Sequence, residues 1–168
     1  MRAVDAGIDI VAHCNWLGPD PGTVLLDEPT IKRMAQDGVI VDLNVQGATP
    51  APGRHRRRGG RLAGDSAQPG CRWDLLEPLR QAGVAMYLTS DAFEPGCDRL
   101  VPHPAGSGRV RARGLGAAEL ISLVTAIPAQ ALDLTDRGGV TPGRTADLAV
   151  FDGDLRSDVS ALSRPRAP

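Results

Sequence analysis

The stretch DEPTIKRMAQDGVIVDLNV, residues 27–45, decides the fold class because it holds one helix and one strand in succession. Asp27 is a residue type that begins helices, and the apolar side chains after it recur at helical spacing. Gly38 is the residue type that most often follows the last turn of a helix. The mostly apolar run Val39–Val45 is typical of a strand buried on both faces. The stretch therefore predicts a helix, a tight turn and a buried strand.

The same alternation extends in both directions along the chain. A short apolar strand is expected over Ile8–Ala12, and His13 follows it directly. Beyond the first helix and strand, a second helix is expected to end at Gly83, and the strand Val84–Leu88 then leads to Asp91. Strands that are separated by helices form βαβ units and a parallel sheet. Such sheets bind ligands beyond the carboxyl ends of their strands, where His13 and Asp91 are expected.

The remaining elements are predicted to be shorter and less regular. Asp74 and Glu77 have the spacing of a capping pair at the start of the second helix. A third helix is expected over Ala117–Ala126, and Pro128–Leu132 is expected as a separate short helix because proline would break a continuous one. Strands are expected at Val140 and Ala146–Phe151, on either side of the turn Thr141-Pro142-Gly143.

Composition excludes several classes of protein. The chain has 168 residues, enough for one modest core, and a formal net charge of −1, which argues against nucleic-acid and membrane-surface partners. No apolar run reaches the length of a transmembrane helix. The three cysteines are odd in number and lack CxxC spacing, which predicts reduced thiols in a cytoplasmic protein. Residues 46–70 are rich in Gly, Pro and Arg and are expected to form a flexible insertion.

Several motifs, in a shared order, resemble the metal-dependent amidohydrolase superfamily, and most closely its imidazolonepropionase and prolidase-like enzymes. The most specific of them is Gly138-Gly139-Val140 followed by Pro142-Gly143-Arg144 and Ala146–Val150. The other matching stretches are Ala6–His13, Leu26-Asp27-Glu28 with Ile31 and Met34, Gly38–Val41, Ala82–Ala92, Thr125 with Pro128-Ala129 and Leu132, and Asp152-Gly153-Asp154.

The resemblance implies an α/β fold, in which a (β/α)₈ TIM barrel carries a small β-sandwich. Within it, His13 matches the metal-binding histidine of strand six, and Asp91 matches the aspartate of strand eight. The expected organisation is thus about the last three barrel strands over residues 1–136, with the insertion at 46–70. Strands of the sandwich are expected over 137–160, and a frayed tail over 161–168.

The family chemistry implies a divalent metal, usually zinc, with His13 and Asp91 as ligands. Asp91 would also be the general base that takes a proton from the attacking water, in hydrolysis of a C–N bond of a cyclic amide, an amidine or a dipeptide-like small molecule. The HxH pair, the lysine and the strand-five histidine of the family have no counterpart here. Because a catalytic zinc needs at least three protein ligands, the isolated chain is expected to be inactive. The alternative is a non-catalytic remnant or interaction module.

Other candidate residues have plainer explanations. The scattered residues Cys14, Cys71, Cys97, His55 and His103 match no zinc module. The basic run Arg54–Arg61 and the three arginines Arg109, Arg111 and Arg113 are read as solvated loops, with a phosphate or a substrate carboxylate as the competing ligand. Cys14 stands where the family commonly has glycine and is expected to pack as a small thiol. Three barrel strands would leave open edges, which predicts self-association or a complementary N-terminal chain.

Overall fold

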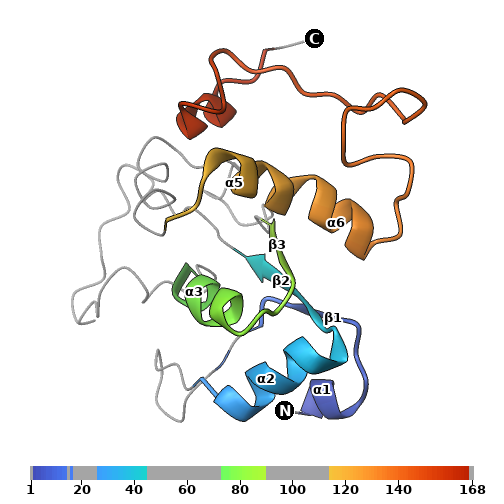
Figure 1. Ribbon diagram of the computed structural model, residues 1–168, viewed down its shortest axis with the longest axis vertical. Coiled ribbons are helices and arrows are strands. Elements are labelled where there is room, and N and C mark those ends of the chain that lie inside the picture. The colour runs from blue at the N-terminus through green and yellow to red at the C-terminus, as the bar shows by residue number, and fades with distance from the viewer. Residues whose placement is uncertain (1, 15, 17–25, 45–72, 90–113, 167–168) are drawn as a thin grey trace, which may run out of the picture. The chain divides into compact units, whose positions relative to one another are not determined.

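The computed structural model describes residues 2–14, 16, 26–44, 73–89 and 114–166 (Figure 1). The chain divides into two compact units, Met1–Asp98 and Arg99–Pro168. The expected insertion at 46–70 and the predicted general base Asp91 lie outside the described residues.

The first unit contains a three-stranded sheet in which neighbouring strands run parallel, in the order β1-β2-β3. Ile10 pairs with Ile40, and Val41 pairs with Met86. The parallel sheet with helices between its strands confirms the α/β class predicted from the alternation of elements. The elements of this unit are α1 Arg2–Asp5, β1 Ile10–Ala12, α2 Glu28–Asp37, β2 Ile40–Asn44, α3 Trp73–Gln81 and β3 Met86–Thr89.

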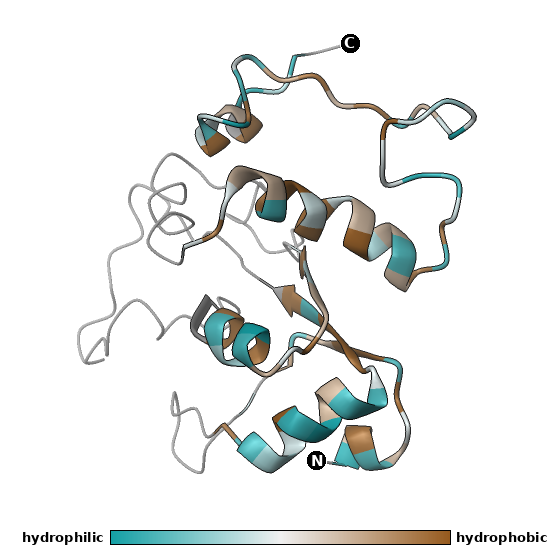
Figure 2. Cartoon of the chain, viewed as in Figure 1, coloured by the Kyte–Doolittle hydropathy of each residue, from teal (hydrophilic) through white to brown (hydrophobic). Residues whose placement is uncertain are grey.

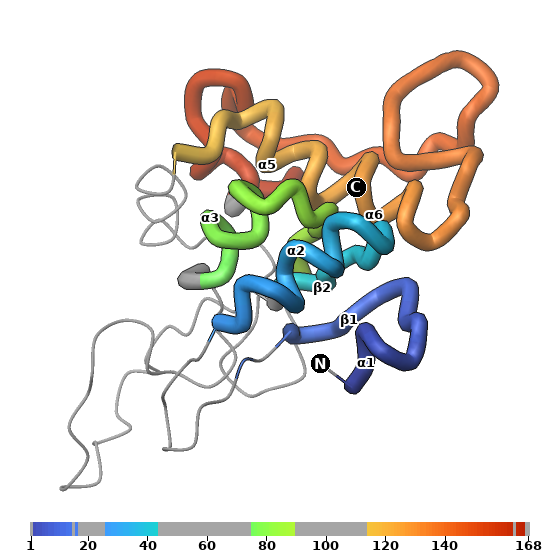
Figure 3. Tube along the Cα trace, turned by 60° about the horizontal axis from the view of Figure 1, so that its bottom comes forward, coloured from blue at the N-terminus to red at the C-terminus, as the bar shows by residue number. Residues whose placement is uncertain are grey.

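One face of this sheet is wholly apolar and forms the core of the unit. Val41 and Leu43 of β2 are fully buried and lie in register with Met86 and Leu88 of β3, so these four side chains share a face. Right-handed crossovers place both connecting helices on one side of a parallel sheet. Figures 1 and 3 show α2 and α3 on one side of the strands, and Figure 2 shows β2 and β3 as apolar segments. The buried residues of these helices are Thr30, Ile31, Met34, Leu75, Leu76 and Leu79.

Both predicted helix-ending glycines have the left-handed conformation that the role requires. Gly38 has a φ of 72° and its N–H donates to the Met34 carbonyl, and Gly83 has a φ of 76°. A residue with a Cβ is disfavoured in this conformation. These two positions thus fix where each helix stops and where the following strand begins.

The starts of the two helices differ from the prediction in detail. Asp27 is the residue before α2, but its side chain makes no cap to the backbone and instead accepts a hydrogen bond from the Thr30 hydroxyl. The expected capping pair of Asp74 and Glu77 is wrong, because α3 already begins at Trp73. The Glu77 carboxylate accepts from Arg80 and Gln81 at distances of 3.1 and 2.9 Å, so it supports the helix from its exposed side.

The second unit is helical at its start and irregular afterwards. Its elements are α5 Ala117–Val124, α6 Ala126–Ala131 and the 3-10 helix η1 Val159–Ser163. The break between α5 and α6 falls at Thr125, whose hydroxyl donates to the Ile121 carbonyl at 2.6 Å. Pro128 lies in the first turn of α6, where its missing N–H costs no helical hydrogen bond. Two separate helices were predicted here, and the second begins two residues earlier than expected.

The predicted strands at Val140 and Ala146–Phe151 are not formed in the part of the chain that the structure describes. Val140, Leu148 and Val150 are 87, 64 and 59% exposed, and the segment has no ladder of hydrogen bonds. Only Phe151 makes an isolated antiparallel bridge, to Pro165. An alternating apolar pattern becomes a strand only when a partner pairs with its backbone groups along its length, and among the described segments only residues 164–166 pair with this one, at its end near Phe151. The expected turn is present, with the Arg144 N–H donating to the Thr141 carbonyl at 3.2 Å.

The end of the chain, expected to be frayed, is partly tied down. The Arg166 N–H donates to the Val150 carbonyl at 2.8 Å, and the Asp152 N–H donates to the Arg164 carbonyl at 2.9 Å. Arg164 also reaches the Asp158 carboxylate. These contacts hold residues 164–166 against the segment around Phe151.

Candidate functional site at the carboxyl edge of the sheet

The three strands of the first unit end at one edge, as parallel pairing requires. Ala12 at the end of β1 pairs with Asp42 of β2, and Asp42 pairs with Tyr87 of β3. Paired residues of a sheet point to the same face, so these three side chains form a row across it. His13 follows this row on β1 and Thr89 ends β3. The candidate site is this carboxyl edge.

A sharp turn with strained backbone presents His13. His13 and Cys14 have φ values of 60° and 44°, in the left-handed region that residues with a Cβ rarely occupy. The Cys14 N–H donates to the Ala12 carbonyl at 2.7 Å, which closes the turn directly after β1. The Cys14 side chain is buried, as expected for a packed small thiol. Such strain persists only where the surrounding structure enforces it, and it marks the end of β1 as a specialised position.

The face of the sheet opposite the apolar core carries polar groups. The Thr89 hydroxyl donates to the Asp42 carboxylate across the two strands. Asp42 and Thr89 are half-buried, whereas the Tyr87 ring is buried. Burial, and after it the negative charge of Asp42, raises the pKa of the Tyr87 phenol. A carboxylate, a hydroxyl and a phenol therefore lie together one row from His13.

Asp42 is a site residue that sequence reasoning missed, although its signal is visible. It is the only charged residue in the apolar run Val39–Val45. A carboxylate inside a strand that reads as buried on both faces is costly unless one face is polar. The predicted run is thus buried on one face only, and the charge marks the other face.

Of the two predicted metal ligands, the structure describes His13, at the end of β1, whereas Asp91 lies outside the described residues. Imidazole and carboxylate are donor types that suit zinc. Within the described ranges, however, no three side chains of histidine, cysteine, aspartate or glutamate gather closely enough to hold a metal ion. The donors of this chain fit a divalent metal in kind, and the described ones are too few for a closed site.

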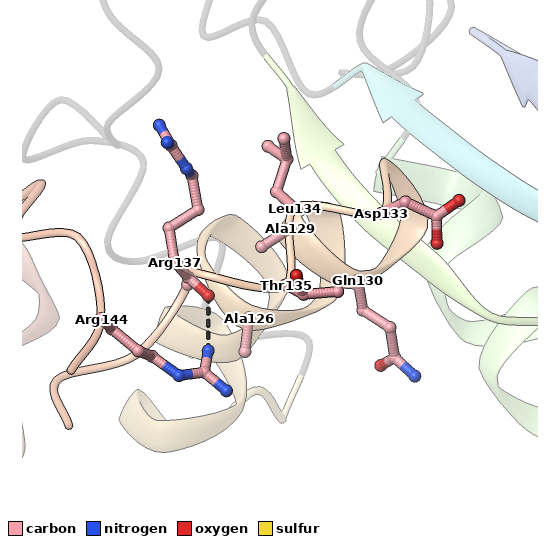
Figure 4. A pocket seen from close by; sticks show the side chains of 9 residues that line it. Ala126, Ala129, Gln130, Asp133, Leu134, Thr135, Arg137 and Arg144 are labelled. Atoms are coloured by element: carbon pink, nitrogen blue, oxygen red, sulfur yellow. Dashed lines mark hydrogen bonds between the residues drawn. The ribbon is translucent and has the colours of Figure 1, made fainter. Parts of the chain in front are cut away.

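A separate pocket of about 380 Å³ lies within the second unit, around α6 (Figure 4). Figure 4 shows Arg144 below the main chain of Arg137, where its guanidinium donates to the Arg137 carbonyl at 2.6 Å. Of the predicted site residues, the described one, His13, does not line this pocket. The lining residues are Ala126, Ala129, Gln130, Asp133, Leu134, Thr135, Arg137, Gly138 and Arg144.

Ion pairs beside this pocket are structural in character. Arg137 pairs with Asp136 at 3.0 Å and with Asp147 at 2.7 Å, and the Thr145 hydroxyl donates to Asp136 at 2.6 Å. The hydrogen bonds from Arg137 and Thr145 hold the pKa of the Asp136 carboxyl well below its usual range. These groups connect residues within 136–147 to one another, and the ion pair of Asp147 is one of these connections.

None of the described helices is long and apolar enough to cross a membrane, and the longest of them, α2, has ten residues.

Comparison with known proteins gives one family match, to the model of the amidohydrolase family over residues 5–166. Nearly the whole chain is therefore similar to that family, including His13, Asp42 and Asp91. The motif match that the sequence suggested thus extends over both units.

Two curated relatives are similar over almost all of this chain. An N-acyl-D-glutamate deacylase from Alcaligenes xylosoxydans xylosoxydans is 33% identical over 98% of the chain, and an imidazolonepropionase from Salinispora tropica is 29% identical over 99% of it. The matches cover 36% and 42% of those two proteins. The chain thus spans about two fifths of the length of these relatives.

Two solved structures have a similar fold. A prolidase solved with N-methylphosphonate-L-proline superimposes with a TM-score of 0.68, at 25% identity, over 98% of this chain and 39% of its own. A structure described as an amidohydrolase superimposes with a TM-score of 0.67 at 24% identity, over 96% of this chain and 37% of its own.

Proposed function

The chain belongs to the amidohydrolase family, and from this premise we propose that it is the C-terminal part of a metal-dependent hydrolase of C–N bonds. The observation that carries the proposal is the family match over residues 5–166, which spans both candidate metal ligands. The names deacylase, imidazolonepropionase and prolidase among its relatives all denote hydrolysis of C–N bonds. The proposed substrate is a small molecule with a cyclic amide, an amidine or a dipeptide-like bond, and the proposed location is the cytoplasm.

His13 and Asp91 are the residues that would hold the metal, through an imidazole nitrogen and a carboxylate oxygen. A divalent ion, when bound, makes water a stronger acid and polarises a carbonyl group. The Asp91 carboxylate accepts the proton of the water that attacks the scissile carbonyl carbon, and returns it to the leaving nitrogen. The turn at His13 and Cys14 sets the direction of the imidazole at the carboxyl edge of β1.

We infer from the motif resemblance that the remaining ligands of such a site have no counterpart among these 168 residues. We propose that they come from residues outside this sequence, which supply the other barrel strands. In this arrangement residues 1–136 form about three strands of the barrel, and residues 137–160 add to a sandwich. The exposed alternate side chains of Leu148 and Val150 support that assignment, because they have the pattern of a strand that lacks a partner.

Competition for zinc tests the proposal on the purified chain. A chromophoric chelator reports the zinc affinity of the wild-type chain and of two variants, His13→Ala and Asp91→Ala, while size-exclusion chromatography reports the oligomeric state. We expect one weak site that each variant weakens at least tenfold. His55→Ala and His103→Ala are matched controls that remove the other two histidines and should retain the affinity.

Two results would count against the hydrolase. Unchanged affinity in His13→Ala and Asp91→Ala would remove both from the metal site. A folded wild-type chain that binds no zinc would favour a non-catalytic interaction module.

A further inference from the structure

The second face of the parallel sheet has one charged group among small and apolar neighbours. Register and alternation place Ile10, Ala12, Ile40, Asp42, Tyr87 and Thr89 on this face. Ala12 is exposed and Asp42 is half-buried, whereas the strand residues Val41 and Leu43 of the opposite face are fully buried. Asp42 is therefore a partly exposed residue on this face, and the partly exposed apolar residues Ile10 and Ile40 lie on the same face.

The hydrogen-bonding capacity of Asp42 is only partly used. An ionised carboxylate offers about four acceptor sites. The Thr89 hydroxyl occupies one of the two oxygens, and within the described residues no other donor and no basic side chain contacts Asp42. A half-buried carboxylate is stabilised by N–H donors and by cations, and a single neutral hydroxyl gives it little of either. Among the residues that the structure describes, the second oxygen thus accepts no hydrogen bond, and a polarised N–H group would complement it.

The neighbours of Asp42 determine its orientation. Thr89 lies on β3 two residues beyond Tyr87, so its hydroxyl bonds to the carboxylate diagonally across the strands. Tyr87 pairs with Asp42 in the register of the sheet, so both side chains belong to the same face. One oxygen is fixed by Thr89, and the other is consequently held at a defined position on the face.

We propose that Asp42 binds an N–H group of a small ligand, of the amidinium, ammonium or amide class, with Thr89 as its positioning residue. The apolar residues Ile10 and Ile40 would contact the body of that ligand. The identification of this ligand with the substrate rests on the proposed function, since the amides and amidines expected there carry such N–H groups. Asp42 is then a residue of substrate selection, distinct from the metal ligands.

The lone tyrosine of the chain makes the proposal testable without an activity assay. Tyr87 is the only tyrosine, so a ¹³C label at its Cζ gives a single NMR signal beside Asp42. Benzamidinium is the probe, and neutral benzamide is its matched analogue. In metal-free buffer, we expect benzamidinium to shift the Tyr87 signal to saturation with a dissociation constant in the millimolar range, and benzamide to bind at least threefold more weakly.

Three variants separate binding by Asp42 from a purely structural pair. Asp42→Asn retains an acceptor for Thr89 and loses the charge, and it should bind benzamidinium at least tenfold more weakly. Thr89→Val releases the carboxylate while retaining its charge, and a smaller loss of about threefold is expected. Asp9→Asn is the control, because Asp9 is an exposed carboxylate at the other end of β1 and should leave the affinity unchanged.

The wild-type chain alone provides a second measurement that does not depend on the folding of a variant. Bound benzamidinium should give nuclear Overhauser contacts between its ring protons and those of Tyr87. A missing saturable shift, missing contacts, or equal affinity in Asp42→Asn and wild type would overturn the proposal. Because no metal is present, these results are independent of the zinc competition, which tests the hydrolase function on its own.

Discussion

The pKa of the single side chain Tyr87 is a measure of the electrostatic environment on the polar face of the sheet. Burial contributes most to its raised pKa, and the charge of Asp42 contributes next. Asp42→Asn should therefore lower the pKa of Tyr87 while leaving it above the ordinary value of 10.0. Absorbance of the tyrosinate during an alkaline titration measures this. The folded state disfavours the tyrosinate. The free energy of unfolding should therefore fall as the pH rises above 10.0, the ordinary pKa of tyrosine, and it should fall less in Asp42→Asn than in the wild type.

A Tyr87 pKa that is the same in Asp42→Asn and in the wild type would show that the carboxylate does not influence the phenol. Asp9→Asn serves as the control here too and should leave the titration unchanged.

The turn after β1 predicts an unusual order of stability at Cys14. Removing the thiol in Cys14→Ala should destabilise the chain by about 1 kcal/mol, because a small buried side chain is lost. Cys14→Gly loses more side chain, but at a φ of 44° it relieves a strain of roughly 1–2 kcal/mol that alanine retains. We expect the glycine variant to be more stable than the alanine variant by about 0.5–1 kcal/mol.

Urea denaturation of both variants measures this difference in the free energy of unfolding. In an ordinary strand or helix the alanine variant would be the more stable one. Finding that order here would mean that the Cys14 backbone is not held in the left-handed region.

Among the secondary-structure elements, α6 depends on the close approach of Gly138. A Cβ at this glycine would lie 2.6 Å from the Ala129 Cβ and 3.2 Å from the Ala126 Cα, and the φ of Gly138 is 84°. Gly138→Ala should therefore cost about 2–4 kcal/mol, as the sum of backbone strain and overpacking. Gly139→Ala is the matched control, since a Cβ there meets nothing within 4 Å.

Thermal unfolding followed by circular dichroism compares the two alanine variants. Equal midpoints would show that Gly138 does not pack on α6.

Lowering the pH should destabilise the C-terminal segment, because it protonates three aspartates there. Hydrogen bonds from Arg137, Arg156 and Ser160 are the first causes that lower the pKa values of Asp136, Asp154 and Asp158, respectively. A carboxyl whose pKa is lower in the folded state stabilises it above about pH 4 and loses that contribution as the pH falls through the folded pKa. Asp136 and Asp154 are exposed and Asp158 is partly exposed, so the effect is local.

The protection factors of the amide protons, which correct the exchange rate for its intrinsic dependence on pH, should thus fall in residues 136–166 before they fall in α2 as the pH is lowered from 5 to 2. Simultaneous loosening of both segments would contradict this order.

The helices and strands of the first unit were predictable from sequence because their signals are local. Gly38 and Gly83 mark the helix ends, and the apolar runs around them are too short for anything but strands. Ala146–Phe151 has an equally good strand pattern and forms none, because a strand also requires a partner, which lies elsewhere in the sequence or outside it. The capping predictions for α2 and α3 were wrong for a similar reason. The Asp27 carboxylate bonds to the Thr30 hydroxyl instead of the backbone, and α3 begins before the residues that were predicted to cap it.

At the scale of the whole molecule, exposed apolar surface predicts self-association of the isolated chain. Leu148 and Val150 are exposed on an unpaired segment, and β1 and β3 each have a single strand neighbour among the described elements. Open edges and apolar patches favour contact between copies. Light scattering should show oligomers whose mass falls in the double variant Leu148→Lys, Val150→Lys. A monodisperse wild-type monomer would contradict the prediction.

The candidate site was only partly predictable for a reason that applies to whole folds. His13 and Asp91 are 78 positions apart in the sequence, and only their resemblance to a family pattern pairs them. Asp42 carried a physical signal of its own, a charge in an apolar run, yet its partner Thr89 is 47 positions away. Local sequence patterns predict where strands end, whereas the register of the sheet determines which residues at those ends lie next to one another.

The sheet order β1-β2-β3, which repeats the order of the chain, has a consequence for synthesis on the ribosome. About 30 residues are synthesised between Ile10 and its partner Ile40, and about 45 between Val41 and its partner Met86. At roughly 5–20 residues per second, each new strand would emerge within several seconds of the one that it joins. Every strand can therefore dock on a neighbour that has already been made, and the unit can assemble while translation of the later residues continues.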